Sequence, residues 1–310
     1  MQLLMHLQSF MALQAKTIKS KIRAVGNVRK ITQAMEKVAA VKMNRVLART
    51  LAAREYALQT YRFLTSLVRH RHLHHPFFSV GRGSATLIVA VASNRGLSGS
   101  VNTQMSRTLA ERRRERPDEQ IEMIAVGRKS EQIARRFGIT VIQSFNTIPD
   151  SVHTRDILHV VQAVSEAFAS GKYSTVLFLY TRFISALSSE PVLRQALPLD
   201  ALEMSKTIEK LSPGAAMTGH GRAFSEYTFE PGEEAVLEFV VPKILEIKLY
   251  KVFLEARLSE HSGRMVAMKN ASENARDIID RLTVNYNRAR QDGITREISE
   301  IAAGAAALGV

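Results

Sequence analysis

The sequence MVAMKNASENARDIIDRLTVNYNRARQDGITREISEIAAGAAAL, residues 265–308, decides the fold of this chain. Its apolar and small side chains recur at alternating steps of three and four residues, at Met265, Met268, Ser272, Ala275, Ile279, Leu282, Tyr286 and Ala289. Such spacing is an a/d seam, which is typical of a helix that lies along a partner helix. Because no proline follows Pro242, a helix of about 65 residues, or ~100 Å, can run nearly to the end of the chain.

The apolar pattern changes register at Gly293. A new stripe follows, at Ile294, Ile298, Ile301, Ala305 and Leu308. Residues 301–310 are apolar on every side, and a helix of this kind is buried rather than solvated. A tip so far from any globular core predicts an apolar sleeve that another protein supplies. The alternative is an Ala-rich tail that merely favours helix.

A second long helix is predicted from about Leu13 to about Arg69, a stretch without proline in which Gly26 is the only glycine. Apolar residues recur at helical spacing in its first half, at Ile18, Ile22, Val25, Ile31, Met35 and Val38. Steps of four and three continue through Leu47, Leu51, Arg54, Leu58, Tyr61, Thr65 and Val68. Two helices at opposite ends of the chain, both too long for a globule, most simply pair as an antiparallel coiled coil.

The chain is strongly basic, with a formal net charge of +14, which predicts an acidic partner. On the first helix Glu36 is the one acid within a series of cations, which are Lys16, Lys19, Lys21, Arg23, Arg29, Lys30, Lys37, Lys42, Arg45, Arg49 and Arg54. A solvated basic face and a nucleic-acid surface are the alternatives. Against nucleic acid, no aromatic residue interleaves with these cations before Tyr56, and no recognition module is present.

The middle of the chain alternates between predicted strands and helices. Strands are expected at Ala85–Ala92, Ile121–Val126, Thr140–Ser144 and Thr175–Tyr180, and helices at about Val101–Arg116, Lys129–Phe137 and His153–Ala169. This order predicts a Rossmann-like α/β domain with a mainly parallel sheet and helices on both faces. After Pro191, an antiparallel hairpin return is expected at Val192–Leu197, a loop or insertion at Leu199–Phe224, and a last short strand at Glu226–Glu230.

We divide the chain into an N-terminal extension at 1–12, a coiled-coil helix at 13–75, the α/β domain at 84–232 and a second coiled-coil helix at 233–310. Met11 is an alternative start, and the residues before it lack the basic region and cleavage site of a secretion signal. The chain has no cysteine, which excludes disulfides and cysteine-ligated metals. Its apolar runs are far shorter than the ~20 residues that a membrane span needs.

No catalytic constellation, cofactor site or metal site is expected. The loop Ser93–Ser100 follows the first strand and opens a helix, where an α/β fold can hold phosphate, but it is neither G-x-G-x-x-G nor a P-loop. The histidines of residues 70–75 could suggest a metal site. No carboxylate lies close to them in sequence, so a helix end with a solvated loop is the simpler interpretation. No G-x-S-x-G motif supports a Ser or His nucleophile.

Three segments carry a resemblance to a known family. The pattern Ile294-Thr295-x-Glu297-x-x-Glu300-x-x-x-Gly304-Ala305-x-Ala307 resembles the C-terminal signature of the gamma subunit of F-type rotary ATP synthases. Residues 27–43, NVRKITQAMEKVAAVKM, resemble the N-terminal helix of that family. The loop at 93–102 is similar to its pattern Ser-Asp-Arg-Gly-Leu-Cys-Gly-Gly-x-Asn, from which Asn94, Ser98 and Ser100 depart while Asn102 matches. The resemblance covers nearly the whole chain from Met11.

The resemblance implies the central shaft of a proton-translocating rotary ATP synthase, present in one copy and without a catalytic site or cofactor of its own. The implied partners are the alpha and beta subunits, the epsilon subunit and the membrane c-ring, with no nucleic acid. The implied protein is associated with the membrane only indirectly, and it lies on the cytoplasmic face of a bacterial inner membrane. Implied contacts with the beta subunit are Met35, Lys37, Lys42, Arg45, Arg264, Arg290, Gln291 and Thr295. The implied bearing tip is Ile301, Ala305 and Leu308, and the residues on the side of the ring or the epsilon subunit are Arg95, Gly96, Leu97 and Asn102.

Two other classes of protein stay open on the residues alone. A nucleotide-using α/β enzyme with a helical arm would need a ligand site at the loop after Val91. A basic coiled-coil protein that binds nucleic acid would show a steep dependence of affinity on salt.

Overall fold

A computed structural model describes residues 2–70, 75–150, 152–200 and 232–308 of the chain. Two compact units divide it: Met1–Val38 with Met265–Val310 form unit 1, and Ala39–Arg264 forms unit 2. The two long helices, α1 (Gln2–His70) and α6 (Glu233–Leu308), contribute residues to both units. The first and last segments of the chain therefore share one unit, and the central α/β portion lies in the other.

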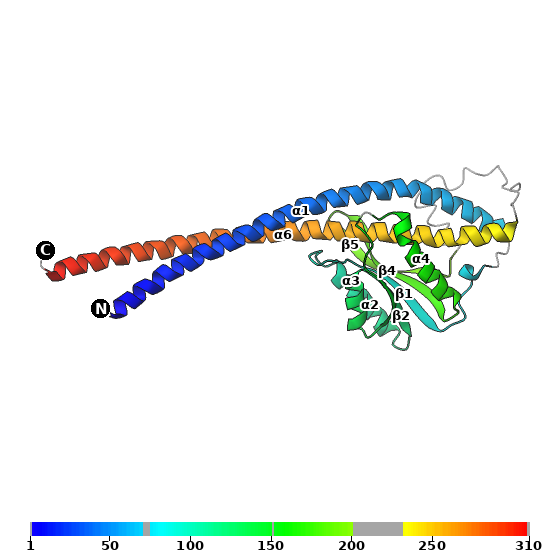
Figure 1. The fold of residues 1–310 in the computed structure, drawn as a ribbon, viewed down its shortest axis with the longest axis horizontal. Coiled ribbons are helices and arrows are strands. Elements are labelled where there is room, and N and C mark those ends of the chain that lie inside the picture. Colours follow the sequence, from blue (N-terminus) through cyan, green and yellow to red (C-terminus); the bar gives the residue numbers. More distant parts are fainter. Residues whose placement is uncertain (1, 71–74, 151, 201–231, 309–310) are drawn as a thin grey trace. The chain divides into compact units, whose positions relative to one another are not determined.

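In unit 1, α1 and α6 run antiparallel along one another, as their periodicity predicts (Figure 1). Every position of the predicted α6 seam from Met265 to Ala289 is buried or half-buried. Residues between the seam positions, such as Glu273, Asp280 and Arg288, are exposed. The alternation of three and four therefore confirms the face of α6 that packs against its partner helix.

The predicted α1 stripe is confirmed at Ile18, Ile22, Val25, Met35, Leu47 and Leu58, which are buried or half-buried, and is wrong at Ile31, Val38 and Leu51. Ile31 and Val38 are 60% and 55% exposed, so they face away from the seam. The seam instead continues through Arg29 and Thr32, at steps of four and three from Val25. A heptad keeps its register through polar residues whose stems can pack, whereas an apolar residue off the seam stays in solvent. The Thr32 hydroxyl donates to the Arg29 carbonyl at 2.9 Å, which satisfies it within the helix.

Unit 2 is built on a five-stranded sheet in the order β3-β2-β1-β4-β5. Its strands are β1 (Ala85–Val91), β2 (Ile121–Val126), β3 (Thr140–Phe145), β4 (Tyr173–Ser185) and β5 (Ser188–Leu197). The first four strands run parallel, and β5 returns antiparallel to β4, which confirms the mainly parallel sheet. Every residue of β1 is buried, as expected for a central parallel strand that is covered on both faces.

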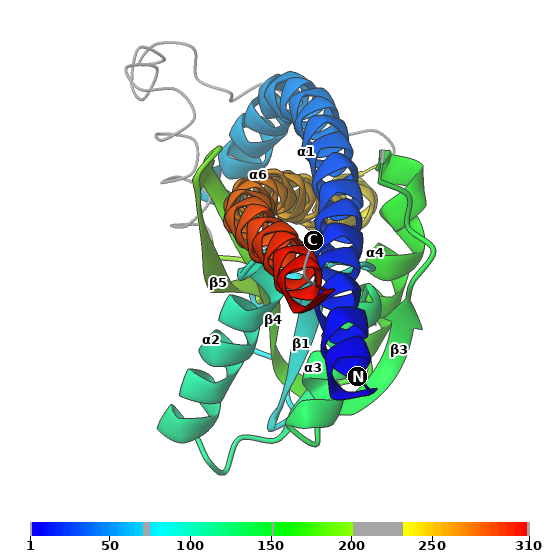
Figure 2. The same cartoon turned by 90° about the vertical axis from the view of Figure 1, so that its left-hand side faces the viewer.

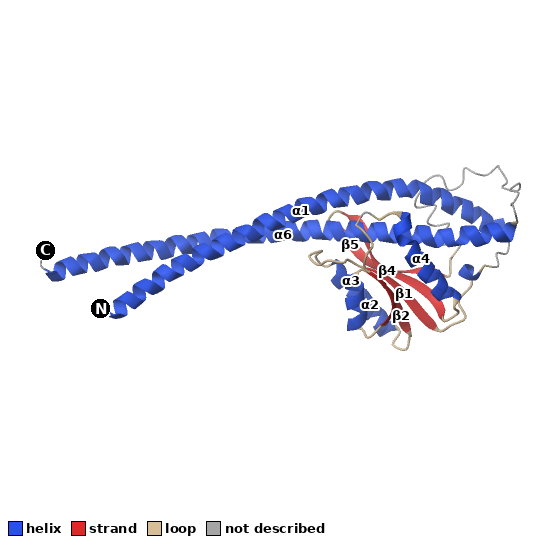
Figure 3. Ribbon diagram, viewed as in Figure 1, coloured by secondary structure: helices blue, strands red, loops and turns tan. Residues whose placement is uncertain are grey.

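Helices cover both faces of this sheet (Figures 2 and 3). They are α2 (Val101–Glu115), α3 (Arg128–Arg136) and α4 (Thr154–Ala169), with a short 3-10 helix, η1, at Pro76–Phe78. On one face, α2 and α3 pack through Met105, Leu109 and Ile133. On the other face lie α4 and the unit 2 part of α6, which contribute residues such as Val164 and Phe253. This is the three-layer α/β arrangement that the sequence predicts.

Two predicted boundaries are corrected. Pro191 lies inside β5, opposite Thr181, rather than ahead of the returning strand. An edge strand accepts proline because one side of its backbone has no ladder to join. The first helix begins at Gln2 rather than at about Leu13, since residues 2–12 contain neither glycine nor proline to end it.

Parts of the prediction fall outside the described residues. These are the strand at Glu226–Glu230 and most of the loop at Leu199–Phe224. Among the helices that are described, none is both long enough and apolar enough to cross a membrane.

Candidate functional site

The carboxyl ends of β1 and β4 meet at the topological switch point of the sheet, where open α/β sheets bind ligands. These two strands are neighbours, and β2 and β3 lie on the other side of β1. In unit 2 this place is filled from α6, whose Ala256, Arg257 and Glu260 reach Ser93 and Thr181. The residual cavity of about 10 Å³ is no larger than one water molecule needs. A nucleotide does not fit the cavity that these residues line.

Four charged or titratable side chains of α6, Arg257, Glu260, His261 and Arg264, form what we call the α6 charge cluster. The Glu260 carboxylate lies between two guanidinium groups: Arg257 Nη1 donates to Oε2 and Arg264 Nη2 donates to Oε1, each at 2.8 Å. Arg257, Glu260 and His261 are buried, so the carboxylate and its two arginines compensate one another's charge away from water.

The same part of α6, residues 257–264, binds the backbone of several neighbouring segments of unit 2. Arg257 Nη2 donates to the Ile148 carbonyl at 3.2 Å, and Arg264 Nη2 donates to the Gly96 carbonyl at 3.3 Å. Ser259 Oγ donates to the carbonyl of Thr181 at 2.9 Å. About two turns of α6 thereby contact the loop after β1, the segment after β3 and strand β4.

The loop after β1 comes very close to α6 at Gly263. A Cβ atom built there would lie 2.6 Å from the Ser98 carbonyl oxygen, a distance that only glycine permits. From the first turn of α2, Asn102 Nδ2 donates to Ser93 Oγ at 2.9 Å and to Ser98 Oγ at 3.2 Å. Leu97 has a φ of 64° and is exposed, an unusual conformation for a residue with a branched side chain. The loop is thus shaped by its own hydrogen bonds and by contact with α6.

An ion pair links α1 to the segment after β3. Lys42 Nζ lies 2.6 Å from Asp150 Oδ2, and both side chains are partly exposed. Close by on α1, Val46 packs against Leu254 and Leu258 of α6. The exposed ion pair contributes about 0–1 kcal/mol, so the apolar packing supplies most of the attachment of α1 within unit 2.

Burial and ion pairing set the protonation of these groups. Burial acts to raise the pKa of the Glu260 carboxyl, but the two flanking arginines outweigh it, and the pKa lies below its ordinary value. The pKa of Asp150 is also lowered, because the hydrogen bond and charge of Lys42 outweigh burial. Burial lowers the pKa of His261, against the opposing effect of the carboxylates of Glu260 and Asp150. Near neutral pH, charged carboxylates therefore surround a neutral histidine.

The structure separates the implied beta-subunit contacts into two groups. Lys42 and Arg264 belong to unit 2 and are ion-paired within the chain, to Asp150 and Glu260. The others are available at the surface or half-buried: Lys37, Arg45, Arg290, Gln291 and Thr295 are exposed, and Met35 is half-buried. Sequence reasoning could not have found the ion pair of Lys42, because its partner Asp150 is 108 positions away.

The residues implied on the side of the ring or the epsilon subunit differ from one another in exposure. Arg95, Gly96 and Leu97 are exposed, whereas the Asn102 side chain is used to bind the loop before α2. At the bearing tip Ile301 is 68% exposed, and the side chains of Ala305 and Leu308 lie outside the described residues.

The α6 charge cluster contains residues that the sequence analysis missed. Arg257, Glu260 and His261 were not singled out, and neither was Asp150. The available signal was an acid flanked by two arginines at i−3 and i+4, a spacing that places all three groups on one helix face. The spacing could not indicate that the cluster is buried. The apolar residues of α6 around the cluster pack partly against the sheet and partly against α1.

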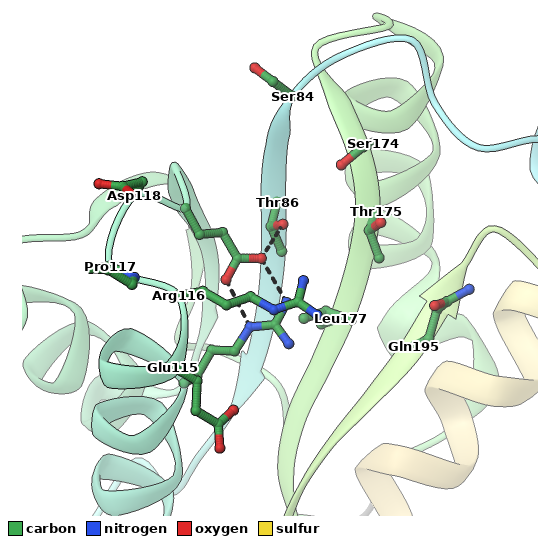
Figure 4. A pocket seen from close by; sticks show the side chains of 12 residues that line it. Ser84, Thr86, Glu115, Arg116, Pro117, Asp118, Ser174, Thr175, Leu177 and Gln195 are labelled. Carbon is green, nitrogen blue, oxygen red and sulfur yellow. Dashed lines mark hydrogen bonds and ion pairs between the residues drawn. The ribbon is translucent and has the colours of Figure 1, made fainter.

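A polar pocket of about 590 Å³ lies at the opposite, amino end of the parallel strands (Figure 4). In it, Arg112 Nε and Nη2 donate to the two Glu119 carboxylate oxygens at 2.7 and 2.6 Å. Thr86 Oγ1 adds a third hydrogen bond to Glu119, at 2.7 Å. Because this acid is fully paired, the pocket holds β1 and α2 together rather than presenting a group for proton transfer.

No metal centre is found among the described residues. The histidine segment predicted to be a loop falls mostly outside them, since residues 71–74 are not described. His75, at its end, accepts a hydrogen bond at Nδ1 from the Phe77 backbone N–H at 3.1 Å and so caps η1.

Comparison with known proteins places the chain in a family. A family model described as ATP synthase matches residues 14–308. The ATP synthase gamma chain of Leptothrix cholodnii is 36% identical over 299 residues, which cover 95% of this chain and 99% of that one. The gamma chain of an Acidovorax species is 35% identical over 296 residues, with coverage of 94% and 99%. The chain therefore belongs to the ATP synthase gamma chain family.

Solved structures share its fold. A chain of the Euglena gracilis mitochondrial ATP synthase, in a structure of OSCP, F1 and the c-ring, aligns with a TM-score of 0.65 at 19% identity, covering 96% of this chain and 95% of that one. A chain of the Tetrahymena thermophila mitochondrial ATP synthase central stalk and c-ring aligns with a TM-score of 0.57 at 23% identity, covering 78% and 99%.

Proposed function

We propose that this chain is the central rotor shaft of a proton-translocating ATP synthase, and that it couples rotation of a membrane c-ring to conformational change at catalytic sites on the beta subunits. The observation that carries the proposal is the family match over residues 14–308 in a chain whose two terminal helices pair antiparallel around an inserted α/β unit. In this proposal the helical segments 13–75 and 233–310 form the shaft, and residues 84–232 form the domain beside the ring.

The mechanism needs a rod whose sides differ. Rotation changes a catalytic site only through interactions whose free energy differs between the states of that site. Unit 1 supplies such differences, because it exposes the donors of Arg290, Gln291 and Thr295 on one helix and the cation of Lys37 on the other. Carboxylates on a beta subunit would be attracted to some orientations of this surface and not to others.

The C-terminal tip has a different role in the proposal. Ile298 and Ile301 are exposed and apolar, and no charged residue follows Glu300. A tip of this kind can turn inside an apolar sleeve without breaking an ion pair at each step. We assign the bearing to Ile301, Ala305 and Leu308, and the sleeve to the alpha and beta subunits.

The proposed partners are the alpha and beta subunits, the epsilon subunit and the c-ring, with one copy of this chain per complex. The chain is then a non-catalytic subunit, peripheral on the cytoplasmic face of a bacterial inner membrane. Arg95 and Leu97, which are exposed, are the residues we place on the side of the ring or the epsilon subunit. Neither the described structure nor the comparisons favour the nucleic-acid alternative.

Co-purification tests the assembly. A tagged chain is recovered from gently solubilised membranes and assayed for ATP hydrolysis. We expect two larger subunits in threefold excess over this chain, together with ATPase activity. Recovery of the chain alone or with nucleic acid would contradict the proposal.

A charge substitution tests coupling. Met35→Lys adds a cation at a half-buried position of α1 that the proposal assigns to the contact with the beta subunit. We expect fewer protons pumped per ATP hydrolysed, with hydrolysis itself retained. Gln33→Lys adds the same charge at an exposed position two residues away and is the matched control. Equal pumping per ATP in the Met35→Lys enzyme and the parent would count against the proposal.

A further inference from the structure

His261 occupies an unusual position within the α6 charge cluster. It is 1% exposed, and its Nδ1 lies 3.5 Å from Arg264 Nη1. A guanidinium group only donates hydrogen bonds, so Nδ1 has to be the acceptor and carries no proton in this arrangement. The ring proton is then on Nε2, which has no hydrogen-bond partner in the described part of the chain. A neutral imidazole with its proton on Nε2 is therefore the form that fits this contact.

The histidine faces charges from three segments of unit 2. On its own helix these are the carboxylate of Glu260 and the guanidinium of Arg264, while Asp150 lies in the segment after β3 and Lys42 on α1. The cations oppose a proton on His261 and the carboxylates favour one. Burial is the largest effect and keeps the ring neutral at pH 7.

Arg264 connects this histidine to the loop after β1. Besides its ion pair with Glu260, the guanidinium donates to the Gly96 carbonyl at 3.3 Å. That hydrogen bond is long, so it is the weaker of the two contacts. A proton on Nδ1 would point an N–H at a group that can only donate, and it would add a positive charge 3.5 Å from another.

We propose that His261 makes the hold of α6 on the exposed 95–97 part of the 93–100 loop sensitive to acid: protonation of Nδ1 displaces the Arg264 guanidinium from the Gly96 carbonyl and releases this part of the loop, while Asn102 keeps Ser93 and Ser98 in place. In the assembled enzyme, release of the loop lowers coupling at acid pH, and this step rests on the proposed rotor function. The loop carries the exposed Leu97 in its strained conformation, so it changes its shape once Arg264 no longer binds it.

The pH window follows from the groups in the cluster. The pKa of Glu260 and that of Asp150 are both lowered, so these carboxylates stay charged from pH 7 down to about 5. Only His261 changes charge there, and the released form takes up the proton more readily because it is solvated. Below a pH of about 6.5 the ratio of released to held loop therefore rises by up to about tenfold per pH unit.

A spin label on the loop tests the release in the full chain without any partner. The chain has no cysteine, so Arg95→Cys creates a unique labelling site at an exposed loop position. We expect the ratio of mobile to immobile label to rise by up to about tenfold between pH 7.5 and 5.5. Adding His261→Gln, whose amide oxygen accepts from Arg264 but does not titrate, should remove most of that rise. His159→Gln, at an exposed position of α4, is the control that should leave it unchanged.

Two outcomes overturn the proposal. One is a label in the parent chain whose mobility does not change between pH 7.5 and 5.5, a result that needs no folded variant. The other is an equal rise in the parent and in His261→Gln, with His261→Asn as the second variant if the glutamine does not fold.

The assembled enzyme tests the consequence for coupling. Protons pumped per ATP should fall at pH 5.5 relative to pH 7.5 more strongly in the parent than in His261→Gln. The same fall in both would overturn the role in coupling. A chain that does not assemble with ATPase subunits would contradict the rotor function, while the spin-label result would still decide the acid-sensitive contact.

Discussion

The close approach of the 93–100 loop to α6 predicts that Gly263→Ala destabilises the protein, against the usual trend for a helix. In an exposed helix, alanine in place of glycine is stabilising by about 0.8–1.0 kcal/mol. At position 263, however, the new Cβ would lie 2.6 Å from the Ser98 carbonyl oxygen and 2.9 Å from Val101 Cγ2. The first is a backbone atom in a loop fixed by Asn102, so it cannot rotate away.

The magnitude comes from these opposing contributions. Overpacking of a well-packed site costs about 1–3 kcal/mol. Because the added Cβ would meet a backbone oxygen at 2.6 Å, we take the upper part of that range, about 2–3 kcal/mol. Subtracting the gain in helix propensity of about 1 kcal/mol leaves a net loss of about 1–2 kcal/mol for Gly263→Ala. In a unit of this size that corresponds to a melting temperature lower by roughly 2–8 °C. The matched control is Gly293→Ala on the same helix, where no atom lies within 4 Å of the added Cβ. It should raise stability by up to about 1 kcal/mol.

Hydrogen exchange measured by mass spectrometry is the assay that suits a chain with two units. Exchange of the β1 peptide, residues 85–91, reports opening of the unit 2 core, and exchange of the α6 seam reports unit 1. Gly263→Ala should speed exchange in β1, whereas Gly293→Ala should slow exchange in the seam. A Gly263→Ala chain as stable as the parent or more so would refute the close contact between α6 and the loop.

Three further substitutions or conditions give sharp expectations. Glu260→Gln leaves Arg257 and Arg264 without their counter-ion, so the free energy of unfolding in urea titration should fall by about 3–5 kcal/mol. A loss below about 1 kcal/mol would show that the ion pairs of Glu260 are not buried. Because the folded-state pKa values of Glu260 and Asp150 are lowered, the contribution of these carboxylates to stability is present above a pH of about 4.5 and is lost as pH falls through the folded-state pKa values. The free energy of unfolding measured from pH 6 to 3 should therefore fall with pH, and its slope against pH should be smaller in Glu260→Gln. Ile31→Ala, outside the seam, should change the free energy of unfolding by no more than about 0.5 kcal/mol, whereas Met268→Ala, within the seam, should lower it by about 2–5 kcal/mol. Equal melting temperatures of the two variants would contradict the assigned register.

The predicted and observed seams show how far periodicity alone can be followed. On α6 the pattern of apolar and small residues was unambiguous, and each predicted seam position is covered. On α1 the sequence offers both Ile31 and Thr32 near the same heptad position, and hydrophobicity favours the wrong one. Register in a coiled coil is a property of the pair, so the buried Thr32 could be identified only once the partner helix was in place.

The α/β unit shows the same division between local and distant information. Buried strands such as β1 and β2 are continuous apolar runs, and their alternation with helices predicted a parallel sheet. The loop after β1 differs from the phosphate-binding motifs on its residues alone. That α6 fills the crevice beside this loop could not be predicted, because Arg257 and Ser93 come together only through the fold.

The sequence by itself determined the two long helices, the face of α6 that is buried, the order of strands and helices, and the resemblance to the gamma chain family. These features follow from the spacing of residues within a single segment, because the regular geometry of a helix or a strand places residues of matching period on one face. The tertiary structure alone decided that Lys42 pairs with Asp150, that Arg264 binds the Gly96 carbonyl, and that His261 is enclosed with them. Charge pairing and burial depend on groups brought together from distant positions, and no periodicity within one segment encodes that proximity.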